Sequence, residues 1–200
     1  MPPISLTTFV DFVIKSGTPR ITCVRDAKKL YAEGYSPVFD FWKALREAIV
    51  ELQREGRPKS VLSDLLGPSV HPKKRESYAQ RIESYRGWMG RKDFEWTGCR
   101  SVLWESGGLS VNVNPELGMR IDGEEHVIKL YFKKDKPSKR RLETMLHLIG
   151  TTLPAEKADA TPGILDVKRG GLFTPTVAVA DIDALLVGEA AAFVAMWNQV

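Results

Sequence analysis

The stretch LSVNVNPELGMRIDGEEHVIKLYFK, residues 109–133, decides the fold of this chain, because it is the longest run in which apolar and polar residues alternate. Its centre is Asp122-Gly123, a dipeptide that favours the positive φ values of a two-residue type I′ turn. The stretch therefore predicts a β-hairpin. The turn also fixes the register, in which Leu117 faces Ile128, and this register places most apolar side chains on one face of the hairpin.

The composition is that of an ordinary globular protein, with 43% hydrophobic and 27% charged residues in a chain of 200. This length can bury a substantial core, so we expect a single domain, 1–200, with a mainly helical part at 1–90 and a sheet-containing core at 91–200. The 29 Lys and Arg residues exceed the 25 Asp and Glu residues by four. Because this excess is small, the distribution of the charges is more informative than their sum.

The sequence also bears on the cellular environment. No apolar run approaches the roughly 18 residues that a membrane-spanning helix needs. The first 17 residues lack the basic segment of a signal peptide and contain Asp11. Cys23 and Cys99 are too few and too far apart for a disulfide framework or a zinc site. We therefore expect a cytoplasmic protein with no membrane partner, in which both cysteines are buried free thiols.

Apolar residues recur with helical spacing through the first 90 residues. Ser, Asp and Pro at the starts and Gly at the ends mark the limits of the helices. On this basis we expect helices at 4–16, 26–34, 36–56, 60–66 and 72–90. Asp26 would cap the second, and Ser36-Pro37 would open the third, which has the longest apolar stripe.

After Gly90 the apolar spacing changes from helical to a period of two. We expect strands at 101–105, 109–121, 125–133, 164–168 and 172–174, a helix at 137–150 and a final helix from Asp181. The predicted fold class is α+β: a helical N-terminal half, an antiparallel three-strand meander followed by a helix, a further short hairpin and a C-terminal helix. Pro115, which cannot donate a backbone hydrogen bond, implies a bulge or an exposed edge within the second strand.

The polar face of the central hairpin places Glu116 opposite Lys129. A carboxylate beside a lysine on adjacent strands can perform nuclease chemistry, because the carboxylate holds a divalent metal ion and the ammonium positions or activates the attacking water. The simpler interpretation is a cross-strand ion pair that stabilises the sheet by about 0.2–1 kcal/mol. Both interpretations predict that the two side chains meet.

The order of elements from about residue 73 to 174 resembles that of the restriction-endonuclease-like PD-(D/E)XK superfamily, in which a helix, a meander, a second helix and a further strand form the core. In that family the second strand carries an acid, and the third carries an acid, any residue and a lysine. The resemblance implies a nucleic-acid-associated protein with a metal-dependent nuclease-like core. It also implies a Mg²⁺ or Mn²⁺ ion as the cofactor.

Carried over to this chain, the resemblance makes Glu116 the first acid and metal ligand, and Lys129 the catalytic lysine. The departure is Val127, which stands where the family has its second acid. Without that ligand, catalysis requires a carboxylate from elsewhere, such as Glu83 on the preceding helix. The sequence therefore leaves open whether the chain is an active phosphodiesterase or has lost catalysis.

A second match to the same family's third strand is Asp166-Val167-Lys168, which ends an apolar run. A helix separates it from the 109–133 hairpin, so it stands in the wrong element for the family pattern. The alternative for Asp166 is an exposed ion pair beside a turn. Asp166 and Lys168 are secondary candidates.

The densest positive stretch of the chain spans the end of the third strand and the start of the next helix. Its members are Lys133, Lys134, Lys136, Lys139, Arg140 and Arg141. These side chains would bind phosphates through counterion release, and an exposed Tyr131 would stack on a base. Cations are disfavoured at a helix N-terminus, which hints at an anionic partner. The alternative is a solvated charged loop.

The remaining motifs are few. The chain has no nucleotide-binding, serine hydrolase or zincin motif, and its three histidines do not show a metal-ligand spacing. His126 alternates with Ile128 and Leu130, so we expect a buried, hydrogen-bonded core histidine. A different function class also stays open: a non-enzymatic domain that binds a protein partner through the charged hairpin face or the C-terminal helix.

Overall fold

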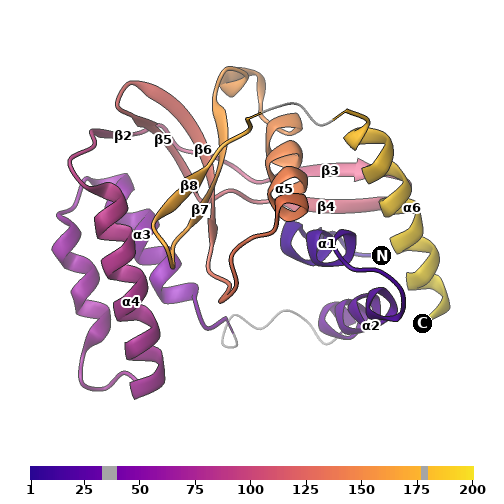
Figure 1. Ribbon diagram of the computed structural model, residues 1–200, viewed down its shortest axis with the longest axis horizontal. Coiled ribbons are helices and arrows are strands. Elements are labelled where there is room, and N and C mark those ends of the chain that lie inside the picture. Colours follow the sequence, from indigo (N-terminus) through magenta and orange to yellow (C-terminus); the bar gives the residue numbers. More distant parts are fainter. Residues whose placement is uncertain (33–39, 177–179) are drawn as a thin grey trace.

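A five-stranded mixed sheet forms the centre of the computed structural model, which describes residues 1–32, 40–176 and 180–200 (Figure 1). In spatial order its strands are β2 (Phe94–Trp96), β5 (Leu117–Ile121), β6 (Glu124–Tyr131), β7 (Thr161–Asp166) and β8 (Gly171–Phe173). β6 and β7 are parallel, whereas the other neighbouring strands of this sheet are antiparallel. Parallel strands need a crossover, and α5 (Lys139–Thr151) provides it.

A separate three-stranded sheet lies beside the first and has the order β1-β4-β3. Its strands are β1 (Ile4–Ser5), β3 (Val102–Ser106) and β4 (Leu109–Val113). β3 and β4 form an antiparallel hairpin, and β1 adds to β4 in parallel. The short β1 therefore ties the N-terminus of the chain to strands that lie a hundred residues later.

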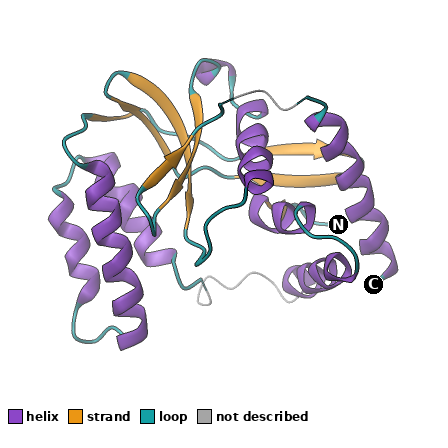
Figure 2. Ribbon diagram, in the orientation of Figure 1, coloured by secondary structure: helices purple, strands orange, loops and turns teal. Residues whose placement is uncertain are grey.

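The helices form two groups on opposite sides of the five-stranded sheet (Figure 2). On one side lie α3 (Lys43–Glu55), α4 (Pro72–Met89) and the 3₁₀ helix η2 (Lys59–Leu66). On the other lie α1 (Leu6–Val13), α2 (Thr18–Ala32), α5 and α6 (Ile182–Gln199). A further 3₁₀ helix, η3 (Ala155–Lys157), follows α5.

Alternation along β6 divides the core between these two groups. Val127 belongs to the apolar cluster that contains α1, α5 and α6, whereas Ile128 belongs to the cluster that contains α3 and α4. Successive strand residues point to opposite faces, so β6, β7 and β8 contribute to both clusters, whereas the cluster residues of β2 and β5 all belong to the cluster with α3 and α4. The α+β fold class, the helical N-terminal half and the C-terminal helix are confirmed.

The predicted hairpin is also confirmed. β5 pairs with β6 in the expected register, with Leu117 opposite Ile128. Asp122 and Gly123 have φ values of +50° and +91°, as a type I′ turn requires. The local turn chemistry alone was therefore enough to place every residue of this strand pair.

The predicted strand 109–121 is wrong as a single strand, because it divides into β4 and β5, which belong to different sheets. The division falls at 114–116, where Pro115 has no N–H to continue a ladder. The predicted strand 101–105 consequently pairs only in the small sheet. The three-strand meander of the large sheet is β2-β5-β6, and its first strand, of three residues, is too short for a periodic signal.

The helices α2 and α3 begin at other residues than the sequence predicts. α2 begins at Thr18, directly after Gly17 at φ +62°, and Asp26 lies within it as an exposed residue instead of capping it. The predicted start at Ser36-Pro37 lies outside the described residues, and α3 begins at Lys43. The residues between the predicted helix 137–150 and the predicted strand 164–168 contain η3 and the first residues of β7.

Both cysteines and His126 lie in or near the core, close to what the sequence predicts. Cys23 and Cys99 are both free thiols; Cys23 is buried and Cys99 is half-buried. Among the described ranges, no helix is both long and apolar enough to cross a bilayer. His126 is buried, as predicted, but its Nδ1 has no hydrogen-bond partner in the described part of the chain.

Candidate functional site

Glu116 and Lys129 meet as predicted, with 2.6 Å between Lys129 Nζ and Glu116 Oε1. Lys129 Nζ also donates to the backbone oxygen of Asn114 at 2.8 Å and to its side-chain oxygen at 3.2 Å. An ammonium has three donors, so all of them are used. Lys129 is only 6% exposed, and this full satisfaction explains how the charge is tolerated there.

The second carboxylate oxygen of Glu116 is occupied as well. Glu116 Oε2 accepts a hydrogen bond from the backbone N–H of Leu130 at 2.8 Å. β5 begins only at Leu117, because the chain turns at Pro115, so the ladder does not reach this N–H. The carboxylate of Glu116 thus replaces a missing strand partner, which gives the pair a structural role at the break between the two sheets.

The residues around this pair do not fit a divalent metal ion. Mg²⁺ and Mn²⁺ prefer several oxygen ligands, but Val127 supplies none at the position of the family's second acid. Both oxygens of Glu116 already accept hydrogen bonds from Lys129 and Leu130. Within residues 1–32, 40–176 and 180–200, no group of three or more His, Cys, Asp or Glu side chains converges as a metal site would require.

Glu83 does not replace the missing acid. It is exposed on α4, a helix whose buried residues pack in the same cluster as Ile128 and Leu130. Lys129 alternates with these two residues along β6 and therefore points to the other face of the sheet. The sheet therefore lies between the two side chains, an arrangement that does not favour Glu83 as the substitute ligand.

Asp166 and Lys168 do not form a catalytic pair either. Asp166 is fully buried, and its carboxylate accepts hydrogen bonds from Arg169 at 2.8 Å and from the backbone N–H of Lys168 at 3.1 Å. Lys168 Nζ instead donates to the backbone oxygen of Lys134 at 3.2 Å. The alternative of an ion pair beside a turn is the better description, with the difference that Asp166 is buried instead of exposed.

The predicted basic cluster divides into an inner and an outer part. Lys133 and Arg141 form the inner part, and both bind the carboxylate of Asp11 on α1, at 2.5 Å and 2.6 Å. Burial lowers the pKa of Lys133, and Asp11 only partly opposes this shift. The sequence patterns did not predict this role for Asp11. Its position within the apolar first helix was the signal that could have revealed this role.

The outer part of the cluster is exposed and consists of Lys134, Lys136, Lys139 and Arg140. Lys139 pairs with Glu143 at 3.6 Å and Arg140 with Glu189 at 3.0 Å. In the described part of the chain, Lys134, Lys136 and Lys168 have no carboxylate within ion-pair distance. These three lysines lie after the carboxyl ends of the parallel strands β6 and β7.

The expectation of an exposed Tyr131 is wrong. Tyr131 is only 5% exposed, and its hydroxyl donates to the backbone oxygen of Asp135 at 3.1 Å. Burial raises the pKa of this hydroxyl. Tyr131 alternates into the apolar cluster of α1 and α5, so it is not available for stacking on a base.

A cavity of about 210 Å³ joins the inner cations to the Glu116–Lys129 pair. Four cationic side chains line it: Arg46, Lys129, Lys133 and Arg141. Glu116 is the one carboxylate among its described lining residues. Arg46, which binds Asp40 at 2.7 Å, comes from α3 and was not predicted, because the helical periodicity of that segment identifies only its apolar face.

Neither of the two surfaces that were predicted for a protein partner, the charged hairpin face and the C-terminal helix, has the features of an interface. On the hairpin, Arg120 binds Glu95 at 2.7 Å and Glu125 binds Lys157 at 2.5 Å, so this charged face is largely paired within the chain. α6 exposes Leu185 and Val187, at 44% and 50%. Two scattered apolar side chains are common on protein surfaces and do not define an interface.

A comparison of the chain with known protein families finds no family model that matches it, and no curated protein matches it either. The resemblance to the PD-(D/E)XK superfamily therefore stays a prediction. The function has to be argued from the geometry of the site.

Proposed function

We propose that this chain is a nucleic-acid-binding protein with a nuclease-like core that does not cleave its ligand. The observation that carries the proposal is the cavity lined by Arg46, Lys129, Lys133 and Arg141. Lys129 and Arg141 are only 6% and 8% exposed, with Glu116 and Asp11 as their carboxylate partners, so the fold holds buried positive charge at this cavity. A cavity among such cations has the chemistry of an anion site.

The charges around the cavity support a phosphate as the anion. Lys133 and Arg141 share the single carboxylate of Asp11, so two positive charges meet one negative charge. The remaining positive charge faces a space of about 210 Å³, which exceeds several times the roughly 30 Å³ of one water molecule. A guanidinium beside an ammonium is a typical arrangement for binding phosphate oxygens.

The exposed lysines next to the cavity would bind further phosphates of the same nucleic acid strand. Lys134 directly follows the cavity residue Lys133, and Lys168 and Arg169 both donate to the backbone oxygen of Lys134, at 3.2 Å and 2.9 Å. Two cationic side chains thus lie beside each other at this carbonyl, and of the two only Arg169 has a carboxylate partner among the described residues, Asp166 at 2.8 Å. An anion beside Lys168 would offset its charge. Successive phosphates of a nucleic acid strand supply such anions. Loss of cleavage follows from the apolar Val127 and the engaged oxygens of Glu116.

The test is the salt dependence of binding to fluorescently labelled DNA and RNA, measured by anisotropy. In Lys134→Ala/Lys136→Ala/Lys168→Ala, we expect weaker binding and a slope of log K against log[salt] that is smaller by up to about 2.7, or about 0.9 for each lost phosphate contact. The matched control, Arg25→Ala/Lys59→Ala/Arg91→Ala, removes three exposed charges from other elements and should leave the slope unchanged.

Two results would count against the proposal. Equal affinity and slope in the triple variant and its control would show that the carboxyl ends of β6 and β7 do not contact phosphates. Cleavage of either nucleic acid with Mg²⁺ or Mn²⁺, abolished by Glu116→Gln, would show that the pair is catalytic after all.

A further inference from the structure

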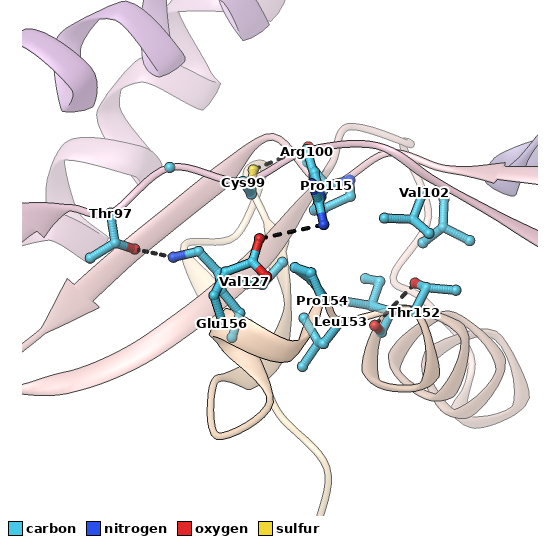
Figure 3. Close-up of a pocket in the computed structure, with 14 residues that line it drawn as sticks. Thr97, Cys99, Arg100, Val102, Pro115, Val127, Thr152, Leu153, Pro154 and Glu156 are labelled. Atoms are coloured by element: carbon cyan, nitrogen blue, oxygen red, sulfur yellow. Dashed lines mark hydrogen bonds and ion pairs between the residues drawn. The ribbon is translucent and has the colours of Figure 1, made fainter.

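A second cavity, of about 320 Å³, lies where the small sheet meets β6 and α5, beneath η3 (Figure 3). Its inner wall is apolar and comes from four elements and two loops, with the side chains Val102, Val113, Pro115, Val127, Ile149 and Leu153. Cys99 adds to this wall. Burial raises the pKa of its thiol to about 11, so the thiol stays protonated and behaves as a small apolar group.

The exposed charged groups of this cavity lie at its rim. Arg100 and Glu156 bind each other at 3.4 Å and are 67% and 63% exposed (Figure 3). Lys157 is engaged elsewhere, because its ammonium binds Glu125 at 2.5 Å and Thr97 at 2.9 Å. Arg100 is therefore the cation that can exchange its partner, since an exposed ion pair contributes little to stability.

The loop that carries Arg100 is held in place before any ligand binds. The backbone N–H groups of Thr97 and Gly98 both donate to the backbone oxygen of Gly118 at 2.9 Å. Lys157 of η3 donates a hydrogen bond to Thr97 of the same loop and pairs with Glu125 on β6, so η3 is fixed beside both. A preformed wall lowers the entropic cost of binding.

We propose that this cavity binds a small apolar carboxylate, with the hydrocarbon part against Val102, Val127 and Ile149 and the carboxylate on Arg100. The volume lies at the lower end of the range of small-molecule sites, which are apolar pockets with a few polar groups. Of the three charged lining side chains, Lys157 is neutralised by Glu125, whereas Arg100 is held only by the exposed Glu156, so Arg100 is the group that an anionic ligand can bind. A guanidinium can bind a carboxylate through two hydrogen bonds once Glu156 has moved away.

The experiment is isothermal titration calorimetry of the full chain with octanoate, octanol and octylammonium, which share one hydrocarbon chain and differ in charge. We expect saturable binding of octanoate to a single site, octanol binding about tenfold weaker and no detectable octylammonium binding. Arg100→Gln should weaken octanoate binding about tenfold and leave octanol binding unchanged. Arg120→Gln is the matched control, because Arg120 is also exposed and paired with a glutamate.

A cavity-filling variant locates the binding. Val127→Phe should abolish octanoate binding, and Leu153→Trp, which fills the cavity from its half-buried η3 side, serves if Val127→Phe fails to fold. Unchanged octanoate affinity in a folded, filled variant would overturn the proposal. So would equal affinities for octanoate and octanol, or an absence of saturable octanoate binding in the unmodified chain.

Discussion

Glu116 and Lys129 form their ion pair in the interior, with side chains that are only 11% and 8% exposed. Removing one partner leaves the other as an uncompensated buried charge. We expect Glu116→Gln and Lys129→Met each to lower the free energy of unfolding by about 3–5 kcal/mol. Urea unfolding followed by circular dichroism measures this change.

The double variant Glu116→Gln/Lys129→Met should lose clearly less than the sum of the two single variants, because it leaves no buried charge. The cross-strand pair of Arg120 and Glu95 is a matched control, since its side chains are exposed. Arg120→Gln should therefore change the free energy of unfolding by no more than about 1 kcal/mol. Additive losses at Glu116 and Lys129 would contradict a structural role for the pair.

His126 gives the protein a pH dependence that is set by a single residue. It is 7% exposed, its Nδ1 is buried without a hydrogen-bond partner in the described residues, and burial lowers its pKa, with Glu124 opposing the shift. The unfolded chain then binds more protons than the folded one below the ordinary pKa of about 6.5. The free energy of unfolding should fall as the pH drops through that value.

The expected slope is at most about 1.4 kcal/mol per pH unit, which is the limit for one proton. Urea unfolding between about pH 7.5 and about pH 5.5 measures it while carboxylates stay ionised. His126→Leu should remove most of this slope, whereas the exposed His71→Gln should retain it. The same slope in His126→Leu and in the unmodified chain would assign the effect to another group.

At the scale of elements, β5 depends on a glycine for its contact with the loop after β2. A Cβ on Gly118 would lie 1.7 Å from the backbone oxygen of Gly98, so the loop would have to move. We expect Gly118→Ala to lower the free energy of unfolding by about 1–3 kcal/mol.

Gly87 is the matched control for this substitution. It lies within α4, and an added Cβ meets nothing within 4 Å. Gly87→Ala should therefore stabilise the protein by about 0.4–1 kcal/mol, through the lower entropy of the unfolded chain. If chemical denaturation showed equal effects at the two positions, the contact between Gly118 and Gly98 would not be restrictive.

The elements that could be predicted are those with local signals. Asp122-Gly123 determined a register, and Ser5 and Ser138 cap α1 and α5 through their side chains, a local role that is typical of serine. The strand 109–121 could not be divided correctly, because Pro115 shows that a ladder is interrupted but not which strand pairs next. β1 was missed for a similar reason, since its partner β4 lies far along the chain.

At the scale of the whole molecule, the candidate site shows the same limit. The pairing of Glu116 with Lys129 follows from one hairpin and was predictable. Asp11 and Arg46 come from helices that are distant in sequence, and only the packing of those helices brings Arg46 to the cavity and Asp11 to the cavity residues Lys133 and Arg141. Burial of Tyr131 likewise depends on α1 and α5, so strand alternation alone could not reveal it.

The central sheet should make the two apolar clusters unfold together. Ile128 on β6 and Ile164 on β7 are both fully buried, but they belong to different clusters on opposite faces of the sheet. A cavity on either face weakens strands that both clusters need. We therefore expect Ile128→Ala and Ile164→Ala each to lower the free energy of opening that hydrogen exchange gives for the slowest-exchanging amides by about 2–5 kcal/mol. The loss should be the same in α4 and in α5.

Native-state hydrogen exchange measures these stabilities separately for each helix. The control is Leu103→Ala on β3, where the side chain is exposed, and it should leave the amide protection of α4 and α5 unchanged. If Ile128→Ala destabilised the amides of α4 while those of α5 kept their protection, the clusters would unfold independently. The cationic cavity, which takes Arg46 from one helical group and Arg141 from the other, would then open before the protein unfolds. If α4 and α5 instead lose protection together, the cavity opens only when the whole protein unfolds.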